Sequence, residues 1–409
     1  MKILIVNKFL YPNGGSETYI FKIGHELEHM GHEVQYFGME HEGRIVGNHA
    51  EIYTEDMNFH NGGISRLTYP FKIIYSIDSK KKIRAVLEDF RPDVVHLNNI
   101  NFQITPSIIE EIRAFNSKIR IIYTAHDYQW VCPNHMLKIP STNELCDRCL
   151  KGNYYNCLKF KCIHNSRIKS FIGMEEARLY RKRGTYRLVD KIICPSEFMN
   201  KMLSNNPQLK GRTVTIHNFY EENTTDFERK ADLNIINQLP NRYVLYFGRY
   251  DEEKGIKTLL RACENMPNIS FVFAGKGEYK ENIHRIQNAT ELGFLKDETL
   301  KYVIQNADIS IYPSEWYENC PFSIVESQLL GTPVIASDIG GIPELLINGE
   351  TGELFRAGNE HELEMKIQLL WNDPNKINSY KTNCTNYILK NIPTLSNYCN
   401  KLLAIYNSQ

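Results

Sequence analysis

The chain has 409 residues, of which 42% are hydrophobic and 23% charged, a balance typical of folded globular proteins and unlike that of disordered chains. Its length exceeds that of one ordinary core and predicts two domains. Lys plus Arg equals Asp plus Glu at 48 each, so no net charge favours a polyanion, and we expect no nucleic acid partner.

The first apolar run, residues 1–6, is too short for the core of a signal peptide, and no small-residue cleavage site follows it. No run of about 18 apolar residues is present in the sequence, so none is predicted to span a bilayer. We therefore expect a cytoplasmic protein with ten cysteines, in a reducing compartment where clustered thiols hold metal rather than form disulfides.

The first half of the chain alternates short β-rich runs with helical patterns, which predicts a parallel sheet covered by helices. The predicted strands are residues 2–7, 32–38, 93–99, 120–127, 190–196 and 213–220. A helix is expected from about Thr18 to Met30. A polar stretch then begins, and we place the end of a first domain, residues 1–218, near Asn218.

Two short motifs follow strands of this half, at the sheet edge where open α/β folds bind ligands. Gly14-Gly15 would let the backbone approach a ligand closely, because glycine tolerates positive φ. His126-Asp127 would offer polar groups to a ligand at this edge. A plain strand-to-helix turn and a structural histidine remain open as readings of these motifs.

Five cysteines fall within a Cys-rich insertion predicted at residues 132–165 of the first domain. They are Cys132, Cys146, Cys149, Cys157 and Cys162. The C-x-x-C spacing of the second and third suits a zinc knuckle, and four thiolates in a reducing compartment predict a structural zinc ion. An iron–sulfur cluster and unliganded thiols are the other readings.

A basic stretch overlaps the end of this insertion. Residues 159–191 contain ten Lys or Arg and three acidic residues, interleaved with apolar side chains. This pattern fits peripheral contact with an anionic membrane surface, and it equally fits a solvated basic helix.

The second half repeats the alternation and predicts a second doubly wound domain at residues 219–390. Its predicted strands are residues 242–248, 269–275, 291–295, 307–314 and 332–338. The tail, residues 391–409, carries Leu395, Tyr398, Leu402 and Ile405 at helical spacing and is predicted to pack back on the first domain. The two sheets are expected to face each other across a ligand-binding cleft.

An acidic pair lies around one predicted helix of this second half. Glu318 precedes the helix, Pro321 suits its first turn, and Glu326 lies within it. The amides near Phe322 and Ser323 would offer free N–H groups to a diphosphate. The other reading is an amphipathic helix with two solvated glutamates.

A charged loop, GRYDEEKG at residues 248–255, follows the first strand of the same half. Arg249 supplies a planar fork for phosphate oxygens and Lys254 a compact charge, both suited to a leaving diphosphate. An exposed charged turn is the alternative.

These motifs together resemble family 4 of the GT-B glycosyltransferases, retaining enzymes that use nucleotide-activated sugars. The resemblance rests on Glu318 with seven residues to Glu326, on GRYDEEKG and on Gly14-Gly15-Ser16-Glu17, and it extends to residues 337–355. It implies an α/β protein of GT-B fold, with two Rossmann-like domains.

The resemblance also implies roles for individual residues. Arg249 and Lys254 would bind the donor diphosphate and stabilise its charge, Glu318 would contact sugar hydroxyls, and Glu326 the ribose. His126 would lie near the O6 atom of the sugar. The expected catalytic set is His126, Arg249, Lys254 and Glu318, and the donor-binding set is Gly15, Gly248, Arg249, Lys254, Glu318, Pro321, Phe322, Ser323 and Glu326. Glu17 and Asp127 are assigned to the acceptor side.

We therefore predict retaining transfer of a sugar from a nucleotide-sugar, with UDP-sugar as the first expectation, to a glycan or lipid-linked acceptor of a bacterial surface polysaccharide. No cofactor is expected for the chemistry, because the two cations and the helix end replace a divalent ion. Replacing Glu326 or Lys254 with Ala is expected to lower turnover and leave folding intact.

Four other functions would explain parts of this sequence. A GT-B sugar-nucleotide epimerase shares the architecture, and an inverting transferase would use His126 as its base. A zinc-containing nucleic-acid-binding protein explains the cysteines but not the glutamate pair. A NAD dehydrogenase is disfavoured, because neither Gly14-Gly15 nor Gly275-Lys276-Gly277 forms the full dinucleotide fingerprint.

Overall fold

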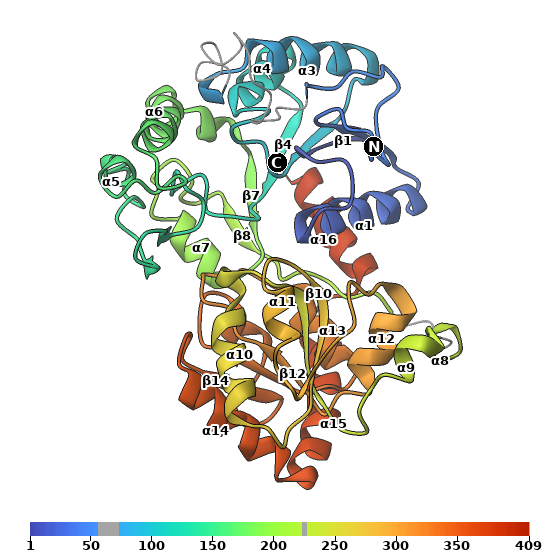
Figure 1. Cartoon of the computed structure of the whole chain (residues 1–409). Helices are drawn as coiled ribbons and strands as arrows, with labels where there is room; N and C mark the ends of the chain where they lie inside the picture. The colour runs from blue at the N-terminus through green and yellow to red at the C-terminus, as the bar shows by residue number, and fades with distance from the viewer. Residues whose placement is uncertain (56–72, 223–226, 409) are drawn as a thin grey trace. The chain divides into compact units, whose positions relative to one another are not determined.

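The computed structural model describes residues 1–55, 73–222 and 227–408, which form two compact units (Figure 1). One unit comprises residues 1–216 together with 395–409, and the other comprises residues 217–394. The expected boundary near Asn218 lies next to this division, and residues 395–409 belong to the first unit. The predicted domain ranges include residues 56–72 and 223–226, which lie outside the described residues.

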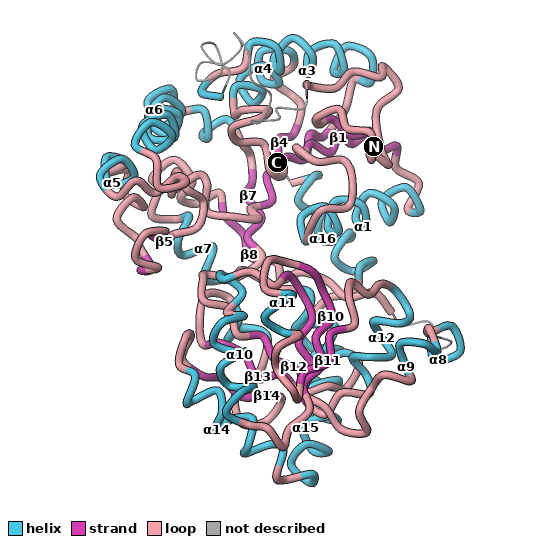
Figure 2. Tube along the Cα trace, in the orientation of Figure 1, coloured by secondary structure: helices cyan, strands magenta, loops and turns pink. Residues whose placement is uncertain are grey.

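The first unit is built on a six-stranded parallel sheet in the order β2-β1-β3-β4-β7-β8. Figure 2 labels β1, β4, β7 and β8 of this sheet. Its strands are β1 (Lys2–Val6), β2 (Glu33–Phe37), β3 (Val94–Leu97), β4 (Arg120–Thr124), β7 (Lys191–Cys194) and β8 (Thr213–Thr215). Each lies inside a predicted range. The central strands β1, β3, β4 and β7 are almost wholly buried and rich in Ile and Val, as expected for a sheet covered on both faces, whereas the edge strand β8 is half-buried.

Helices and short turns connect these strands. They are α1 (Gly15–His29), α3 (Ile77–Phe90), α4 (Ser107–Phe115), α5 (Tyr155–Lys159), α6 (Arg167–Arg183), η2 (Thr185–Leu188) and α7 (Glu197–Leu203). Between β4 and α6 the chain also forms a small antiparallel pair, β5 (Lys138–Ile139) with β6 (Glu144–Leu145).

Helix α1 begins at Gly15, earlier than the predicted start near Thr18. It buries Tyr19, Ile23 and Leu27 on one face. Gly24 lies on the same face, where an added Cβ atom would be 1.7 Å from the hydroxyl oxygen of Tyr36. A larger residue at Gly24 would therefore push α1 away from β2.

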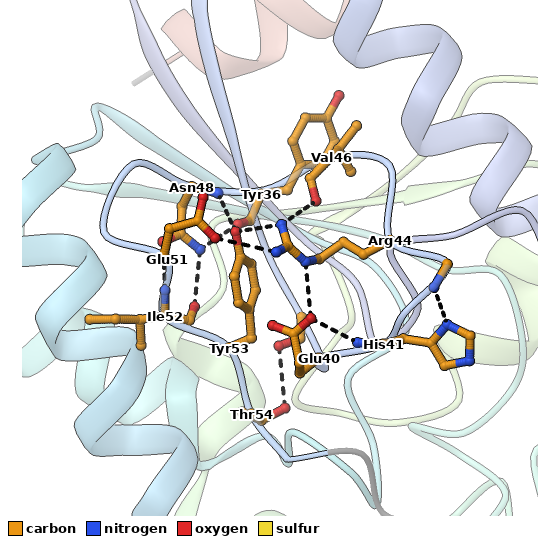
Figure 3. A network of polar contacts seen from close by, with 12 residues as sticks. Tyr36, Glu40, His41, Arg44, Val46, Asn48, Glu51, Ile52, Tyr53 and Thr54 are labelled. Carbon is orange, nitrogen blue, oxygen red and sulfur yellow. Dashed lines mark hydrogen bonds and ion pairs between the residues drawn. The ribbon is translucent and has the colours of Figure 1, made fainter.

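A polar network fixes the segment that follows β2, the edge strand of the sheet (Figure 3). Arg44 Nη1 donates to the Tyr53 hydroxyl at 2.8 Å, and Asn48 Nδ2 donates to the backbone oxygens of Tyr36 and Ile52, each at 3.0 Å. The Tyr36 amide also donates to the Gly47 carbonyl. This segment covers the outer edge of β2, which would otherwise expose unpaired backbone groups.

The C-terminal helix α16 (Leu395–Asn407) packs against α1 in the first unit (Figure 1). Its buried residues are Tyr398, Cys399, Leu402 and Tyr406, so Tyr406 takes the core position that we predicted for Ile405. The Tyr398 and Tyr19 hydroxyls lie 2.9 Å apart, and Tyr406 lies 2.6 Å from His96 Nδ1 on β3. The last residues of the described chain thus complete the core of the first unit.

The second unit has its own parallel sheet, in the order β11-β10-β9-β12-β13-β14. The strands are β9 (Val244–Arg249), β10 (Phe271–Lys276), β11 (Ala289–Glu291), β12 (Ile309–Tyr312), β13 (Val334–Ser337) and β14 (Gly352–Phe355). The strand β14 was not predicted, and β11 begins before its predicted range of 291–295. Gly352 of β14 packs tightly on β13, because a Cβ atom on it would lie 2.2 Å from the Val334 carbonyl oxygen.

The helices of the second unit complete the alternation. They are α8 (Phe227–Lys230), α9 (Leu233–Ile236), η3 (Glu252–Lys254), α10 (Ile256–Asn265), α11 (Lys280–Ile283), α12 (Asp297–Gln305), α13 (Phe322–Leu329), η4 (Ile342–Leu345), α14 (Glu360–Trp371) and α15 (Pro374–Asn391). Because α15 continues to Asn391, the predicted domain end at residue 390 falls within its last turn.

Candidate active site

Two loops meet at one edge of the second sheet. Strands β9 and β12 are parallel neighbours, with Val244 opposite Ile309. Their carboxyl ends therefore lie side by side, which is where open α/β sheets bind ligands. The loop after β9 contains Lys254, and the loop after β12 contains Glu318.

Lys254 and Glu318 form a largely buried ion pair between these loops. The Lys254 Nζ atom lies 2.5 Å from Glu318 Oε1 and 3.1 Å from the Tyr312 hydroxyl. The same carboxylate oxygen accepts from Ser314 Oγ at 2.9 Å and from Trp316 Nε1 at 2.5 Å. The side chain of Glu318 is 9% exposed and that of Lys254 18%.

This environment keeps Glu318 ionised. Burial by itself raises the pKa of the Glu318 carboxyl, but the charge of Lys254 and the hydrogen bonds from Lys254, Trp316 and Ser314 outweigh that effect, so its pKa lies below the ordinary value. The structure therefore presents a buried carboxylate beside an ammonium group.

Close backbone packing places Lys254 in this position. Gly255, which follows η3, has a φ of +71°, and a Cβ atom there would lie 1.8 Å from the Pro313 carbonyl oxygen. The Glu315 amide donates to the Glu253 carbonyl at 2.9 Å and joins the two loops. Only glycine fits between the end of β12 and the start of α10 without displacing one of them.

A second glycine contact holds the backbone of Glu318. The Gly341 amide donates to the Glu318 carbonyl at 2.8 Å. Gly340 has a φ of +61°, and a Cβ atom there would lie 2.4 Å from the Glu318 carbonyl oxygen. The loop after β13 thus packs directly against the loop that carries Glu318.

Helix α13 begins at Phe322, directly after Pro321, and no side chain caps its N-terminus. Its first-turn amides include those of Phe322 and Ser323, as predicted from the sequence. Glu326 lies one turn further along and is half-buried. Uncapped amides at a helix N-terminus attract an anion such as a phosphate group.

Arg249 and Gly248 form the end of β9 rather than part of a loop. The side chain of Arg249 is 60% exposed and pairs with Asp251 at 2.7 Å. Gly248 has a φ of +146°. Gly275 of β10 packs against it so closely that a Cβ atom on Gly275 would lie 1.9 Å from the Gly248 carbonyl oxygen. Arg249 is therefore a solvent-facing cation on the same strand that leads to Lys254.

His126 in the first unit follows β4. Its Nε2 atom lies 2.9 Å from Asn98 Oδ1, and the ring of Tyr19 packs edge-on at 5.0 Å. The Asn98 amide nitrogen donates to two carbonyls, so Asn98 Oδ1 is the acceptor and His126 Nε2 carries the proton. Burial lowers the pKa of His126 to about 3, which keeps the ring neutral near pH 7.

The predicted residues around the first loop have different surroundings. Neither Gly14 nor Gly15 has a positive φ, and a Cβ on Gly15 would meet nothing within 4 Å. Glu17 is 2% exposed and accepts from Asn7 Nδ2 at 2.9 Å. Asp127 Oδ1 accepts from the Gln129 amide. Glu17 therefore stabilises the turn after β1.

The five clustered cysteines line one small pocket in the first unit. In the parts of the chain that the structure describes, no group of three or more His, Cys, Asp or Glu side chains is arranged so that it could hold a metal ion as it stands.

Comparison with known families identifies both halves of the sequence. The model described as "Glycosyltransferase Family 4" matches residues 13–223, and the model described as "Glycosyl transferases group 1" matches residues 230–387. The chain belongs to glycosyltransferase family 4. The resemblance to this family, which rested on Glu318, Glu326 and the two loops, is therefore confirmed.

Curated relatives of this family 4 chain include proteins of known and unknown activity. An uncharacterized 42.6 kDa protein in the cps region of Klebsiella pneumoniae is 24% identical over 84% of this chain and 87% of that protein. Sulfoquinovosyl transferase SQD2 of Arabidopsis thaliana is 26% identical over 47% of this chain, and glycogen synthase of Mycobacterium tuberculosis is 31% identical over 32%. The chain spans only 39% and 34% of the lengths of these last two proteins.

Solved structures show the fold of this family 4 chain. Sucrose-phosphate synthase from Thermosynechococcus elongatus has a TM-score of 0.69 at 17% identity, covering 99% of this chain and 98% of that one. Anabaena HepE in complex with UDP-glucose has a TM-score of 0.65 at 18% identity, covering 99% and 100%. The predicted GT-B fold with two Rossmann-like units is confirmed.

Sequence reasoning missed several members of the site in this family 4 chain. Tyr312, Ser314 and Trp316 contact Lys254 or Glu318 directly, and Gly340 and Gly341 hold the Glu318 backbone. A signal was available for the first three, because they flank Glu318 at the end of a predicted strand. No local signal marks the two glycines, which reach the site only through the sheet order.

Proposed function

We propose that the protein transfers a sugar, with retention of anomeric configuration, from a nucleoside diphosphate sugar to a glycan or lipid-linked acceptor. The observation that carries this proposal is the Lys254–Glu318 pair at the carboxyl ends of β9 and β12, next to the uncapped N-terminus of α13. A cation, a carboxylate and the uncapped amides of a helix lie close together there, and this combination suits a ligand with both phosphate and hydroxyl groups.

The cationic groups of the second unit would bind the diphosphate. In this proposal Lys254 and Arg249 contact phosphate oxygens, and the first amides of α13 donate to the same group. Glu318 accepts hydrogen bonds from sugar hydroxyls, and Glu326 from the ribose. UDP-glucose is the first donor to test, because HepE, a protein of the same fold, forms a complex with it.

The transfer step follows from these positions. The bond between the anomeric carbon and the phosphate oxygen breaks, and the bond to the acceptor oxygen forms on the same face of the sugar. The acceptor proton passes to the leaving phosphate, so no protein base is required. Lys254, Arg249 and the helix end stabilise the charge that develops on the phosphate.

The acceptor is proposed to belong to a bacterial surface polysaccharide, supported by the relative in the cps region of Klebsiella pneumoniae. No helix within the described ranges is long and apolar enough to cross a membrane. Contact with a lipid-linked acceptor would then use the protein surface.

Helix α6 offers such a surface. Ile168 and Phe171 are 74% and 49% exposed on it, surrounded by exposed basic side chains. Those basic residues are Arg167, Lys169, Arg178 and Lys182. We propose that this face rests on anionic lipid at the cytoplasmic side of a membrane.

Sedimentation with lipid vesicles tests this surface. The fraction of protein that sediments should rise with the phosphatidylserine content of the vesicles and fall for the double variant Ile168→Ser/Phe171→Ser. Equal binding to neutral vesicles would rule the surface out.

Product analysis tests the transfer itself. The chain is incubated with UDP-glucose and related donors, with and without a lipid-linked or oligosaccharide acceptor, and the products are examined by NMR. We expect a glycosylated acceptor with the anomeric configuration of the donor, and no loss of rate with a chelator. Conversion of the donor to an epimeric sugar without acceptor would instead support the epimerase, and inverted product would exclude the retaining step.

A further inference from the structure

The segment between β4 and α6 has little regular structure. Within residues 128–165 only the two-residue strands β5 and β6 and the five-residue helix α5 form. Six of the eleven non-glycine residues with positive φ in the described chain fall here. They are His135, Leu137, Asn143, Lys161, His164 and Asn165. Turn hydrogen bonds hold this backbone in place of helix or sheet ladders, among them Cys132 N to the Tyr128 carbonyl and Cys162 N to the Cys157 carbonyl.

The cysteines of this segment converge. Cys132, Cys146, Cys149, Cys157 and Cys162 all line one cavity of about 10 Å³, together with Asn134, Lys138, Asn156 and Phe160. Four of the five thiols are buried, and Cys146 is half-buried. The Cys157 and Cys162 side chains lie within hydrogen-bonding distance of each other. A cavity of this size accommodates a single ion, not a substrate.

Hydrogen-bond donors and two cationic side chains lie around the sulfur atoms. The backbone amides of Asn134 and Leu137 donate to the Cys132 sulfur, and that of Cys157 donates to the Cys149 sulfur. Arg148 Nη1 lies 3.7 Å from Cys146 Sγ. Lys138, only 3% exposed, also lines the cavity, whose lining contains no carboxylate.

We propose that this cluster binds one structural zinc ion through four thiolates, with Cys149, Cys157 and Cys162 as ligands and the fourth from Cys146 or Cys132. Zinc prefers four sulfur ligands in a tetrahedron, and a site of four thiolates carries a net charge of about −2. Lys138 and Arg148 offset that charge. Each coordinating thiol releases its proton to solvent as its bond to zinc forms.

The structure also defines what must move. No group of three or more potential ligands among the described residues is arranged for a metal as it stands, so the sulfurs must turn toward a common point on binding. The ion would then join α5, which contains Cys157, to the turns after β6 and after α5, which contain Cys149 and Cys162. Its binding free energy would stabilise a segment that has few backbone ladders.

Metal analysis tests the site on the full chain, purified without oxygen and with a reductant. We expect about one zinc ion per chain, and loss of it in Cys149→Ser, Cys157→Ser and Cys162→Ser. One of Cys146→Ser and Cys132→Ser should lose zinc and the other keep it. Cys384→Ser is the matched control, because Cys384 is a buried thiol outside the cluster, in the second unit.

A second measurement covers variants that do not fold. Replacing the ion with cobalt in the unaltered chain should give the visible absorption of a tetrahedral thiolate site. Removing the metal should increase hydrogen exchange in residues 128–165 and leave β9–β14 unchanged. Absence of metal, iron in place of zinc, or a Cys157–Cys162 disulfide found by mass spectrometry would each overturn the proposal. All readouts are independent of transferase activity.

Discussion

At the scale of residues, the main finding is that Lys254 and Glu318 are partners in the structure. Glu318 is buried and ionised because Lys254 lies 2.5 Å away, and Lys254 is held by the same contact. A donor diphosphate would compete with Glu318 for the ammonium group. In the proposed function, binding of the donor would therefore be coupled to rearrangement of this pair.

The pairing revises one expectation. Lys254→Ala would leave the buried Glu318 carboxylate without its cation, so we now expect it to lower the free energy of unfolding by about 2–4 kcal/mol, not to leave folding intact. The kcat value should also fall by about 10²- to 10³-fold, because the developing phosphate charge loses a donor. Chemical denaturation and donor-saturated kinetics measure the two effects separately.

A double variant separates stability from catalysis. Lys254→Met/Glu318→Gln removes both charges, so its loss of stability should be smaller than the sum of the two single losses, while activity stays low. Glu326→Ala is the control: it is half-buried on α13, and we expect reduced turnover with little change in stability. Strictly additive losses would show that the two charges do not interact in solution.

The same pair predicts a dependence of stability on pH. The folded-state pKa of Glu318 lies below its ordinary value, so the carboxylate stabilises the fold at neutral pH. As pH falls below the ordinary glutamate range, near about 4.3, the unfolded state binds the proton first and this stability is lost. Glu318→Gln should therefore show a shallower loss of unfolding free energy in acid than the unaltered chain.

At the scale of elements, the site depends on three loops that pack through glycine. The loops after β9, β12 and β13 contact one another where Gly255 and Gly340 leave no room for a Cβ atom. Their geometry is fixed by backbone contacts, and the side chains of Lys254 and Glu318 are positioned by that backbone. A change at these glycines should act on catalysis without removing any functional group.

Gly340→Ala tests this dependence. The added methyl group would lie 2.4 Å from the Glu318 carbonyl oxygen, so the Glu318 loop must shift. We expect kcat to fall by about 10- to 100-fold, since small displacements of site groups have effects of this size. Gly349→Ala is the matched control, because Gly349 also has a positive φ, +84°, with nothing within 4 Å of the added atom.

Both variants carry the same backbone strain, about 1–2 kcal/mol for a left-handed residue. Only Gly340→Ala should impair the reaction, as seen in steady-state kinetics with both substrates saturating. Equal activity in the two variants would show that the contact between the loops after β12 and β13 does not position Glu318.

At the scale of the whole molecule, the chain crosses between its two units more than once. Residues 217–394 form the second unit, and the chain then returns so that α16 completes the first. Tyr398 and Tyr19, joined by a hydrogen bond, are 379 residues apart in the sequence. The last helix of the first unit therefore follows the whole of the second unit along the chain.

Removing α16 should destabilise the first unit selectively. Its buried side chains each contribute on the order of 1.5–3 kcal/mol, so deleting residues 395–409 is expected to expose the core around α1 and β3. Hydrogen exchange should rise throughout β1, β3 and β4 and remain low in β9, β10 and β12. The substitution Tyr398→Phe should have the same effect to a smaller extent. Asn400→Ala is its control, because Asn400 is exposed on the same helix.

Much of the fold was predictable from local sequence. The buried strands of both sheets are short runs of Ile, Val and aromatic residues followed by turn or polar residues, and these runs located them. β14 was missed because Gly352-Glu353-Leu354-Phe355 has no such run, and its pairing with β13 depends on the missing side chain of Gly352. The early start of α1 at Gly15 likewise has no local signal.

The sequence by itself determined the family, the alternation of strands and helices, and the residue types of the donor site, because those are encoded in contiguous motifs. Only the tertiary structure decided which of these residues meet. Lys254 and Glu318 are 64 residues apart, and the order of strands places β9 beside β12. The burial that makes their pairing strong comes from side chains and glycines of three separate loops, which no local pattern encodes.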